Sequence, residues 1–129
     1  MIGVDTNLLV RILTNDDPMQ ALRAAKVLQS DEIYIAKTVL LETEWILRHA
    51  YEIEKANIKK GFLKLLGLPN VSVEDPDSVT QAISWYESNL DFADALHLAS
   101  SKRCEKFATF DRAFIKKAQR FGSTEMIKP

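Results

Sequence analysis

Two kinds of hydrophobic pattern alternate along the chain. Short apolar segments rich in β-branched residues predict buried strands, and longer segments whose apolar residues recur every three or four positions predict amphipathic helices. The clearest helix runs from Met19 to Gln29, with its apolar residues on one stripe. The predicted strands are residues 1–4, Ile33–Ile35, Val71–Val73, Phe107–Phe110 and a small fifth strand, Glu125–Ile127.

Local signals place the ends of the helices. Thr38 is a candidate N-cap for a long helix, and Gly67 ends another. Alternation of short strands with helices is typical of a parallel sheet covered on both faces. We therefore predict one α/β domain over residues 1–129, a three-layer α/β/α arrangement around a central parallel sheet of four to five short strands. Besides Met19–Gln29, the predicted helices are a short one through Leu8–Leu13, Val39 to about Tyr51, about Lys55–Leu66, a helix from Asp75-Pro76-Asp77 through Tyr86, Phe92–Lys102 and Arg112–Arg120.

Composition narrows the class of protein. The 129 residues are 47% hydrophobic and 27% charged, as in ordinary globular domains. The single cysteine, Cys104, excludes an internal disulfide and a Cys-rich zinc site. Neither a secretory leader nor an apolar stretch of about 18 residues is present, so we expect a cytoplasmic protein without a membrane partner. The net charge of −1 argues, at first, against a nucleic-acid protein.

Acidic residues follow two of the predicted strands. Asp5 ends the first strand and Asp111 follows the fourth. Ligands of parallel sheets bind beyond the carboxyl ends of the strands, which makes both acids candidate site residues. The alternative for each is an ordinary helix N-cap. Thr109 lies two positions before Asp111, so in a strand it points to the same side, where its hydroxyl could serve a metal-bound water.

Two further pairs of acids lie on predicted helices. Asp91 and Asp94 share one helix face, and the alternative to a functional role is a capping arrangement with Asp91 at the N-cap. Asp94 stands among core-type residues, where a carboxylate needs a partner such as a metal ion. Glu42 and Glu44 flank opposite sides of an apolar helix, so periodicity leaves open which of them reaches a site. Arg48, four positions after Glu44, favours Glu44 as the structural acid.

Clustered carboxylates without counter-charges repel one another unless a cation binds. Oxygen ligands of this kind suit Mg²⁺ or Mn²⁺, and such ions support phosphodiester hydrolysis by water. No Gly-rich phosphate loop occurs, so nucleoside triphosphate binding has no support. The acids therefore predict a metal-dependent hydrolase.

The motifs resemble those of the PIN-domain family, and within it the VapC-type toxins of bacterial toxin–antitoxin pairs. The resemblance covers essentially the whole chain and rests on Asp5-Thr6-Asn7, Val39-Leu40-Leu41-Glu42, Asp91-Phe92-Ala93-Asp94-Ala95-Leu96 and Thr109-Phe110-Asp111. It implies a Mg²⁺- or Mn²⁺-dependent endoribonuclease whose partners are RNA, a small VapB-like antitoxin and a second copy of the chain. The implied catalytic residues are Asp5, Glu42, Asp94 and Asp111, with Asn7 and Thr109 in secondary roles.

Roles within this set also follow from the resemblance. Asp5 and Asp94 would hold the metal chiefly, Asp91 and Asp111 would assist, and Glu42 would orient or deprotonate the attacking water. Glu44 departs from the family pattern, in which an apolar residue is usual. The alternative function is a PIN-fold module that binds RNA or a protein without catalysis. Asp-based phosphatases and response-regulator receivers fit poorly, because only one acid closes the first strand.

The acidic site changes the meaning of the charge balance. Without the four catalytic acids, 14 of the 18 acidic residues remain against 17 basic ones, so the rest of the molecule is mildly basic. Basic residues gather around the last acid, either as a solvated helix face or as a contact for the RNA backbone. They are Lys102, Arg103, Lys106, Arg112, Lys116, Lys117 and Arg120.

Overall fold

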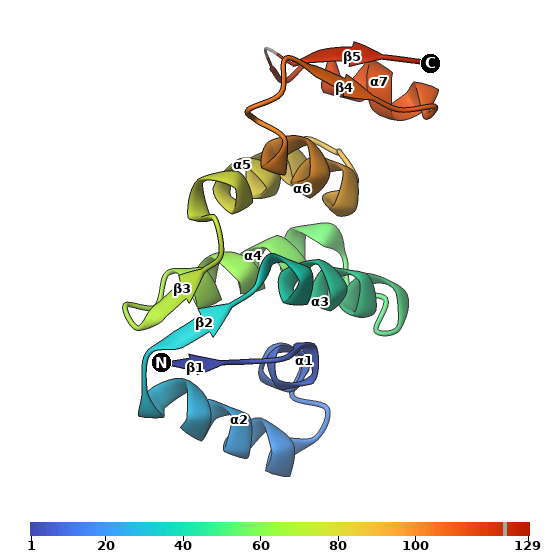
Figure 1. Cartoon of the computed structure of the whole chain (residues 1–129). Coiled ribbons are helices and arrows are strands. Elements are labelled where there is room, and N and C mark those ends of the chain that lie inside the picture. The colour runs from blue at the N-terminus through green and yellow to red at the C-terminus, as the bar shows by residue number, and fades with distance from the viewer. Residues whose placement is uncertain (123) are drawn as a thin grey trace. The chain divides into compact units, whose positions relative to one another are not determined.

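The computed structural model describes residues 1–122 and 124–129, and helices alternate with strands along it (Figure 1). The chain forms two compact units, Met1–Pro76 and Asp77–Pro129. The elements are β1 (Ile2–Gly3), α1 (Thr6–Thr14), α2 (Pro18–Ser30), β2 (Ile33–Ile35), α3 (Lys37–His49), α4 (Lys55–Leu66), β3 (Val71–Val73), α5 (Pro76–Glu87), α6 (Phe92–Ser100), β4 (Lys106–Ala108), α7 (Arg112–Ala118) and β5 (Glu125–Ile127).

The first unit is built on a parallel sheet with the strand order β1-β2-β3. Ile2 pairs with Ile33, and Ile33 pairs in turn with Val71. Each crossover between neighbouring strands contains two helices, which is the length of connection that parallel strands need. Fully buried apolar side chains of this unit include Leu9 and Phe62. Burial of such side chains is the main source of its stability.

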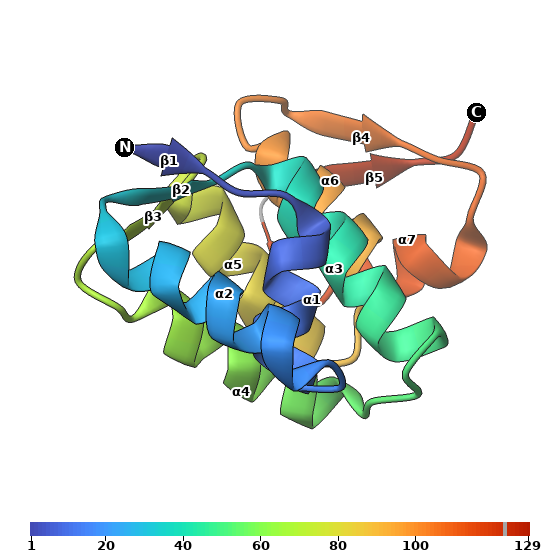
Figure 2. The same cartoon turned by 90° about the horizontal axis from the view of Figure 1, so that it is seen from below.

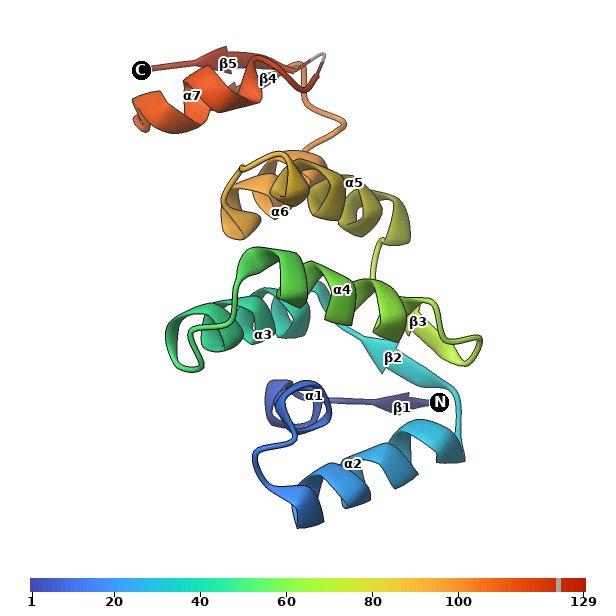
Figure 3. The ribbon, with the colours of Figure 1, turned by 180° about the vertical axis from the view of Figure 1, so that it is seen from behind.

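The described residues of the second unit combine the helices α5, α6 and α7 with a two-stranded parallel sheet. β4 pairs with β5, so that Lys106 lies opposite Glu125. Helices α5 and α6 lie side by side (Figure 3), and the buried Ser78 hydroxyl donates a hydrogen bond to the Ala99 carbonyl between them at 3.1 Å. Tyr86 meets Phe92 edge to face, with ring centroids 5.2 Å apart.

The predicted α/β fold class is confirmed. All five predicted strands are present, and those that pair do so in parallel, as three strands in the first unit and two in the second. The predicted strands 33–35, 71–73 and 125–127 and the helix 55–66 have the predicted bounds. No helix of the described residues is long and apolar enough to cross a membrane.

Two local predictions are wrong. Thr38 does not cap α3. The helix begins at Lys37, two residues earlier than predicted, with Ala36 as its N-cap, and the Lys37 N–H donates to the Glu74 carboxylate at 2.9 Å. The fourth strand ends at Ala108 rather than Phe110. There the Asp111 N–H donates to the Thr109 hydroxyl at 3.1 Å, which turns the chain toward α7.

Candidate active site

Asp5 lies where β1 gives way to α1. Its carboxylate accepts a hydrogen bond from the Leu8 N–H at 3.1 Å and caps the helix. The cap uses one carboxylate oxygen, Oδ1, and the side chain is exposed. Asp5 is therefore an N-cap, as the alternative interpretation held, and it keeps a second oxygen on the solvent side for another ligand.

Glu42 and Glu44 have different environments on α3. Glu44 is only 1% exposed, and its carboxylate accepts a hydrogen bond from Arg48 Nε at 2.7 Å. This confirms the predicted pair with Arg48, one helical turn away. Glu42 is exposed, and its Oε1 accepts a hydrogen bond from the Thr6 hydroxyl. Glu42 is therefore the exposed acid of this helix, and Glu44 is a buried structural one.

Thr6 is a residue that sequence reasoning missed. It is 6% exposed and is the first residue of α1, next to Asp5 in the chain. Because its hydroxyl reaches Glu42 across 36 positions of sequence, it connects the helix that Asp5 caps to the helix that carries Glu42. The available signal was a hydroxyl residue directly after the first acid. Its partner could not be read from the sequence, since no local periodicity relates α1 to α3.

Three acids gather in the second unit. Asp91 caps α6 and accepts a hydrogen bond from the Asp94 N–H at 3.3 Å. Asp94 follows in the first turn of the same helix. Asp111 caps α7 through the Phe114 N–H at 3.0 Å. All three acids thus stand at helix N-termini, where the backbone dipole favours negative charge.

Asp94 is the electrostatically perturbed member of this group. Partial burial raises its pKa above the ordinary value, and the negative charges of Asp91 and Asp111 raise the pKa further. His97 and Lys117 act in the opposite direction but do not outweigh these effects. The ionised form of Asp94 is therefore less favoured than it would be in water, and a bound cation would favour it.

The two secondary residues are placed differently. Asn7 is exposed in the first turn of α1, two residues after Asp5. Thr109 lies beyond the end of β4, where its hydroxyl accepts the hydrogen bond from the Asp111 N–H. Its hydroxyl proton remains available as a donor. Each secondary residue thus neighbours an acid of its own unit.

The structure thus gathers the predicted acids in two groups. In the first unit, Thr6 connects the Asp5 cap with Glu42. In the second unit, Asp91 and Asp111 are close enough to Asp94 for their negative charges to raise its pKa.

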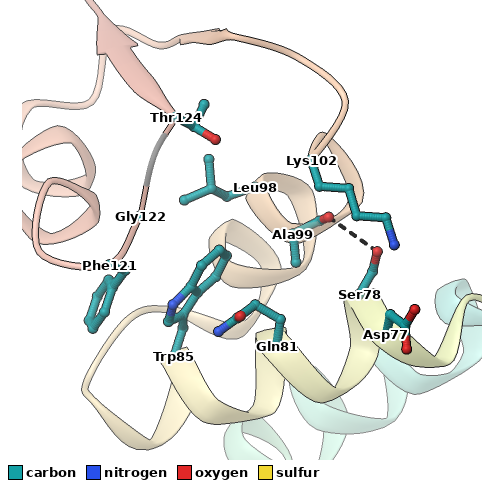
Figure 4. Close-up of a pocket in the computed structure, with 10 residues that line it drawn as sticks. All are labelled: Asp77, Ser78, Gln81, Trp85, Leu98, Ala99, Lys102, Phe121, Gly122 and Thr124. Atoms are coloured by element: carbon teal, nitrogen blue, oxygen red, sulfur yellow. Dashed lines mark hydrogen bonds between the residues drawn. The ribbon is translucent and has the colours of Figure 1, made fainter.

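A hollow of about 410 Å³ also lies in the second unit, but it holds none of the predicted acids. Figure 4 shows Trp85 and Leu98 among the residues that line it, with the Ser78–Ala99 hydrogen bond to their right. The acidic residue in its lining is Asp77, at the start of α5. This hollow is therefore not the candidate active site.

Comparison with known families identifies the fold. The model of the PIN domain matches residues 2–120, nearly the whole chain. The chain belongs to the PIN-domain family. A comparison with curated proteins found no match. PIN domains are generally nucleases, so the chain has a nuclease-type function, and its α/β fold agrees with that of the family.

PIN domains typically depend on divalent metal ions. In the described part of this PIN domain, no three acidic, histidine or cysteine side chains form a ready-made ligand set. Mg²⁺ does not require one, because it is usually held by one or two carboxylates, with water and substrate phosphate as the other ligands. The available donors are carboxylate oxygens, and the negative charges of Asp91 and Asp111 lie close enough to Asp94 to raise its pKa. In donor chemistry the residues therefore fit Mg²⁺ or Mn²⁺.

Proposed function

We propose that this PIN domain is a Mg²⁺- or Mn²⁺-dependent endoribonuclease, the toxin of a VapBC-type toxin–antitoxin pair. The observation that carries the proposal is the repulsive acidic group of Asp91, Asp94 and Asp111 within a PIN domain. A cation bound beside a partly buried carboxylate that has two acidic neighbours would stabilise its ionised form. We further propose that residues 1–129 act as one domain in the cytoplasm, supported by a family match that includes both compact units.

The proposed roles follow the four motifs. Asp5 and Asp94 hold the metal chiefly, with Asp91 and Asp111 assisting. When bound, the ion lowers the pKa of water and stabilises the leaving oxygen. Glu42 orients the attacking water and accepts its proton, and the products carry a 5′-phosphate and a 3′-hydroxyl.

Neighbouring residues support the acids in this proposal. The Thr6 hydroxyl fixes the orientation of the Glu42 carboxylate. Asn7 and Thr109 have secondary roles beside Asp5 and Asp111. None of these three side chains carries a charge, so each would adjust orientation and hydrogen bonding without opposing the negative charge that binds the cation.

Exposed residues support the proposed partners. The basic side chains around the last acid are all exposed, and we propose that they contact an RNA backbone: Lys102, Arg103, Lys106, Arg112, Lys116, Lys117 and Arg120. Trp45 on α3 is 57% exposed, although the helix is otherwise rich in apolar residues. An exposed tryptophan of this kind is typical of a protein interface. We propose the Trp45 face as a contact for the antitoxin or for a second copy of the chain.

The proposed site is tested by acid-to-amide substitutions. Purified Asp5→Asn and Asp94→Asn variants are compared with the wild type in cleavage of a labelled structured RNA with Mg²⁺ or Mn²⁺. We expect each to lower the rate by at least about a hundredfold, as loss of an essential catalytic group does. Asp17→Asn is the matched control, because Asp17 caps α2 with the same 3.1 Å geometry as Asp5 but lies outside the proposed site.

Cleavage that persists in both variants would overturn the proposed site. If calorimetry detected no binding of Mg²⁺ or Mn²⁺ at millimolar concentration, the chain would be a binding module rather than a nuclease. The toxin role has its own test, which is expression in a host that lacks the antitoxin. We expect growth arrest with the wild type and normal growth with Asp94→Asn, and normal growth with both would refute the role.

A further inference from the structure

A groove of about 310 Å³ lies between α1 and α2 in the first unit, where Figure 2 shows the two helices side by side. Its volume lies at the lower end of the range of ligand sites. Its apolar lining is formed by Leu8, Ala24 and Val27, and its polar lining by Asn7, Arg11, Gln20 and Arg23. The groove therefore combines an apolar floor with amide and guanidinium groups.

The two arginines of this groove differ in their partners. The Arg11 guanidinium is held by Asp16 at 3.0 Å, Gln20 at 2.6 Å and the Tyr51 hydroxyl at 3.2 Å. Arg23 is exposed, and among residues 1–122 and 124–129 it has neither a hydrogen bond nor an ion pair. Arg11 therefore shapes one end of the groove, while Arg23 offers an uncompensated positive charge to a ligand.

The groove begins beside the first acid of the proposed site. Asn7 lines it and follows Asp5 by two residues. Asn7 and Arg11 lie one helical turn apart on the same side of α1, so the groove extends along this helix by about 6 Å from Asn7. An RNA strand cleaved at Asp5 extends in both directions from the reacting phosphate. The groove lies beside Asp5, where one of these two extensions can bind.

We propose that this groove binds the RNA strand next to the point of cleavage. The Arg23 guanidinium pairs with a backbone phosphate, which its planar fork of donors matches. The apolar floor takes the ribose or base of the same nucleotide, and Asn7 supplies an amide donor or acceptor. The inference rests on the proposed nuclease function and adds a nucleotide subsite to it.

The test measures RNA binding without cleavage. A labelled single-stranded oligoribonucleotide is titrated by fluorescence anisotropy against the full-length wild type, Arg23→Ala and Arg23→Lys, in the absence of divalent metal. Lys60→Ala is the control, because Lys60 is an exposed cation of the same unit on another helix, α4. We expect Arg23→Ala to weaken binding by about five- to tenfold at low salt and to reduce the log–log salt slope by about 0.7.

Arg23→Lys should keep the salt slope but recover only part of the affinity, because lysine keeps the charge and loses the fork. In cleavage assays, Arg23→Ala should raise KM and leave kcat unchanged. If Arg23→Ala binds and cleaves RNA no worse than Lys60→Ala, the subsite is refuted while the nuclease proposal stands. If the wild type cleaves no RNA, the nuclease proposal fails instead.

A protein segment is the competing occupant of the groove, since Met19 and Leu22, which lie on α2 outside the groove lining, are 66% and 55% exposed. Gel filtration of the same variants separates the two. An Arg23→Ala protein that loses self-association but binds RNA normally would overturn the RNA subsite.

Discussion

Replacing Thr6 with valine isolates one hydrogen bond of the proposed site. Valine has nearly the shape of threonine, so the substitution removes the hydroxyl that donates to Glu42 and leaves the volume of the side chain in place. A hydrogen bond to a charged group contributes about 1.5–3 kcal/mol. Glu42 is exposed, so water replaces part of what is lost, and the lower end of this range applies.

A loss of about 1.5 kcal/mol in transition-state stabilisation corresponds to a decrease of roughly tenfold in kcat. KM should not change, because Glu42 is proposed to act on water rather than on the RNA. Thr6→Ser keeps the hydroxyl and should cleave RNA within about twofold of the wild type, since the donor to the carboxylate remains. The assay is single-turnover cleavage of a labelled RNA at saturating Mg²⁺.

The thermal stability of both variants serves as the folding control. Since Glu42 can be hydrated, Thr6→Val should lower the free energy of unfolding by less than about 1 kcal/mol, equivalent to a few degrees in Tm. A Thr6→Val protein that melts near the wild type and cleaves at the wild-type rate would refute the positioning role. Equal losses of rate in Thr6→Ser and Thr6→Val would also refute it, since the loss would then not follow the hydroxyl.

Two further predictions concern stability. Arg48→Met removes a cationic partner of the buried Glu44 and should lower the free energy of unfolding, measured by chemical denaturation, by about 1–3 kcal/mol. Arg48→Lys keeps the positive charge and should lower the free energy of unfolding less. Equal free energies of unfolding for the two variants would contradict a role for charge. The hydrogen bond from the Tyr51 hydroxyl to Asp16, at 2.7 Å, lowers the pKa of Asp16 below the ordinary value of an aspartate. Its stabilisation is therefore present above about pH 4 and is lost as the pH falls through the lowered value. Tyr51→Phe should be less stable than the wild type at pH 7, and the difference in free energy of unfolding between the two proteins should shrink as the pH falls from 5 to 2. A difference that does not vary with pH would contradict the role of Tyr51 in lowering the pKa of Asp16.

The parts of the fold that were predictable have strong local signals. Helix α4 ends at Gly67, and β2 is the triplet Ile33–Ile35, whose two isoleucines are fully buried. Such segments are decided by their own residues. The start of α3 was not predictable, because the Lys37 N–H finds its partner in Glu74, 37 positions away. The end of β4 depends on a turn that only the Thr109–Asp111 hydrogen bond reveals.

The candidate site also has some features that were predictable from the sequence and others that were not. The pairing of Glu44 with Arg48 was predictable, because residues four apart on a helix are neighbours. The contact between Thr6 and Glu42 was not, since it depends on how α1 packs against α3. The raised pKa of Asp94 lies between these cases: its neighbour Asp91 is visible in the sequence, and the influence of Asp111 needs the tertiary structure.

The sequence left open whether Asp5 and Asp111 are helix caps or functional acids. These two roles do not exclude each other. Both residues cap a helix, and each cap uses one oxygen of the carboxylate. A cap fixes the side chain at the start of a helix, so the second oxygen can take a ligand at little further entropic cost. Asparagine caps a helix about as well as aspartate does. An amide substitution at these positions therefore preserves the fold and removes the charge, which is why the asparagine variants, rather than alanine ones, test the proposed chemistry.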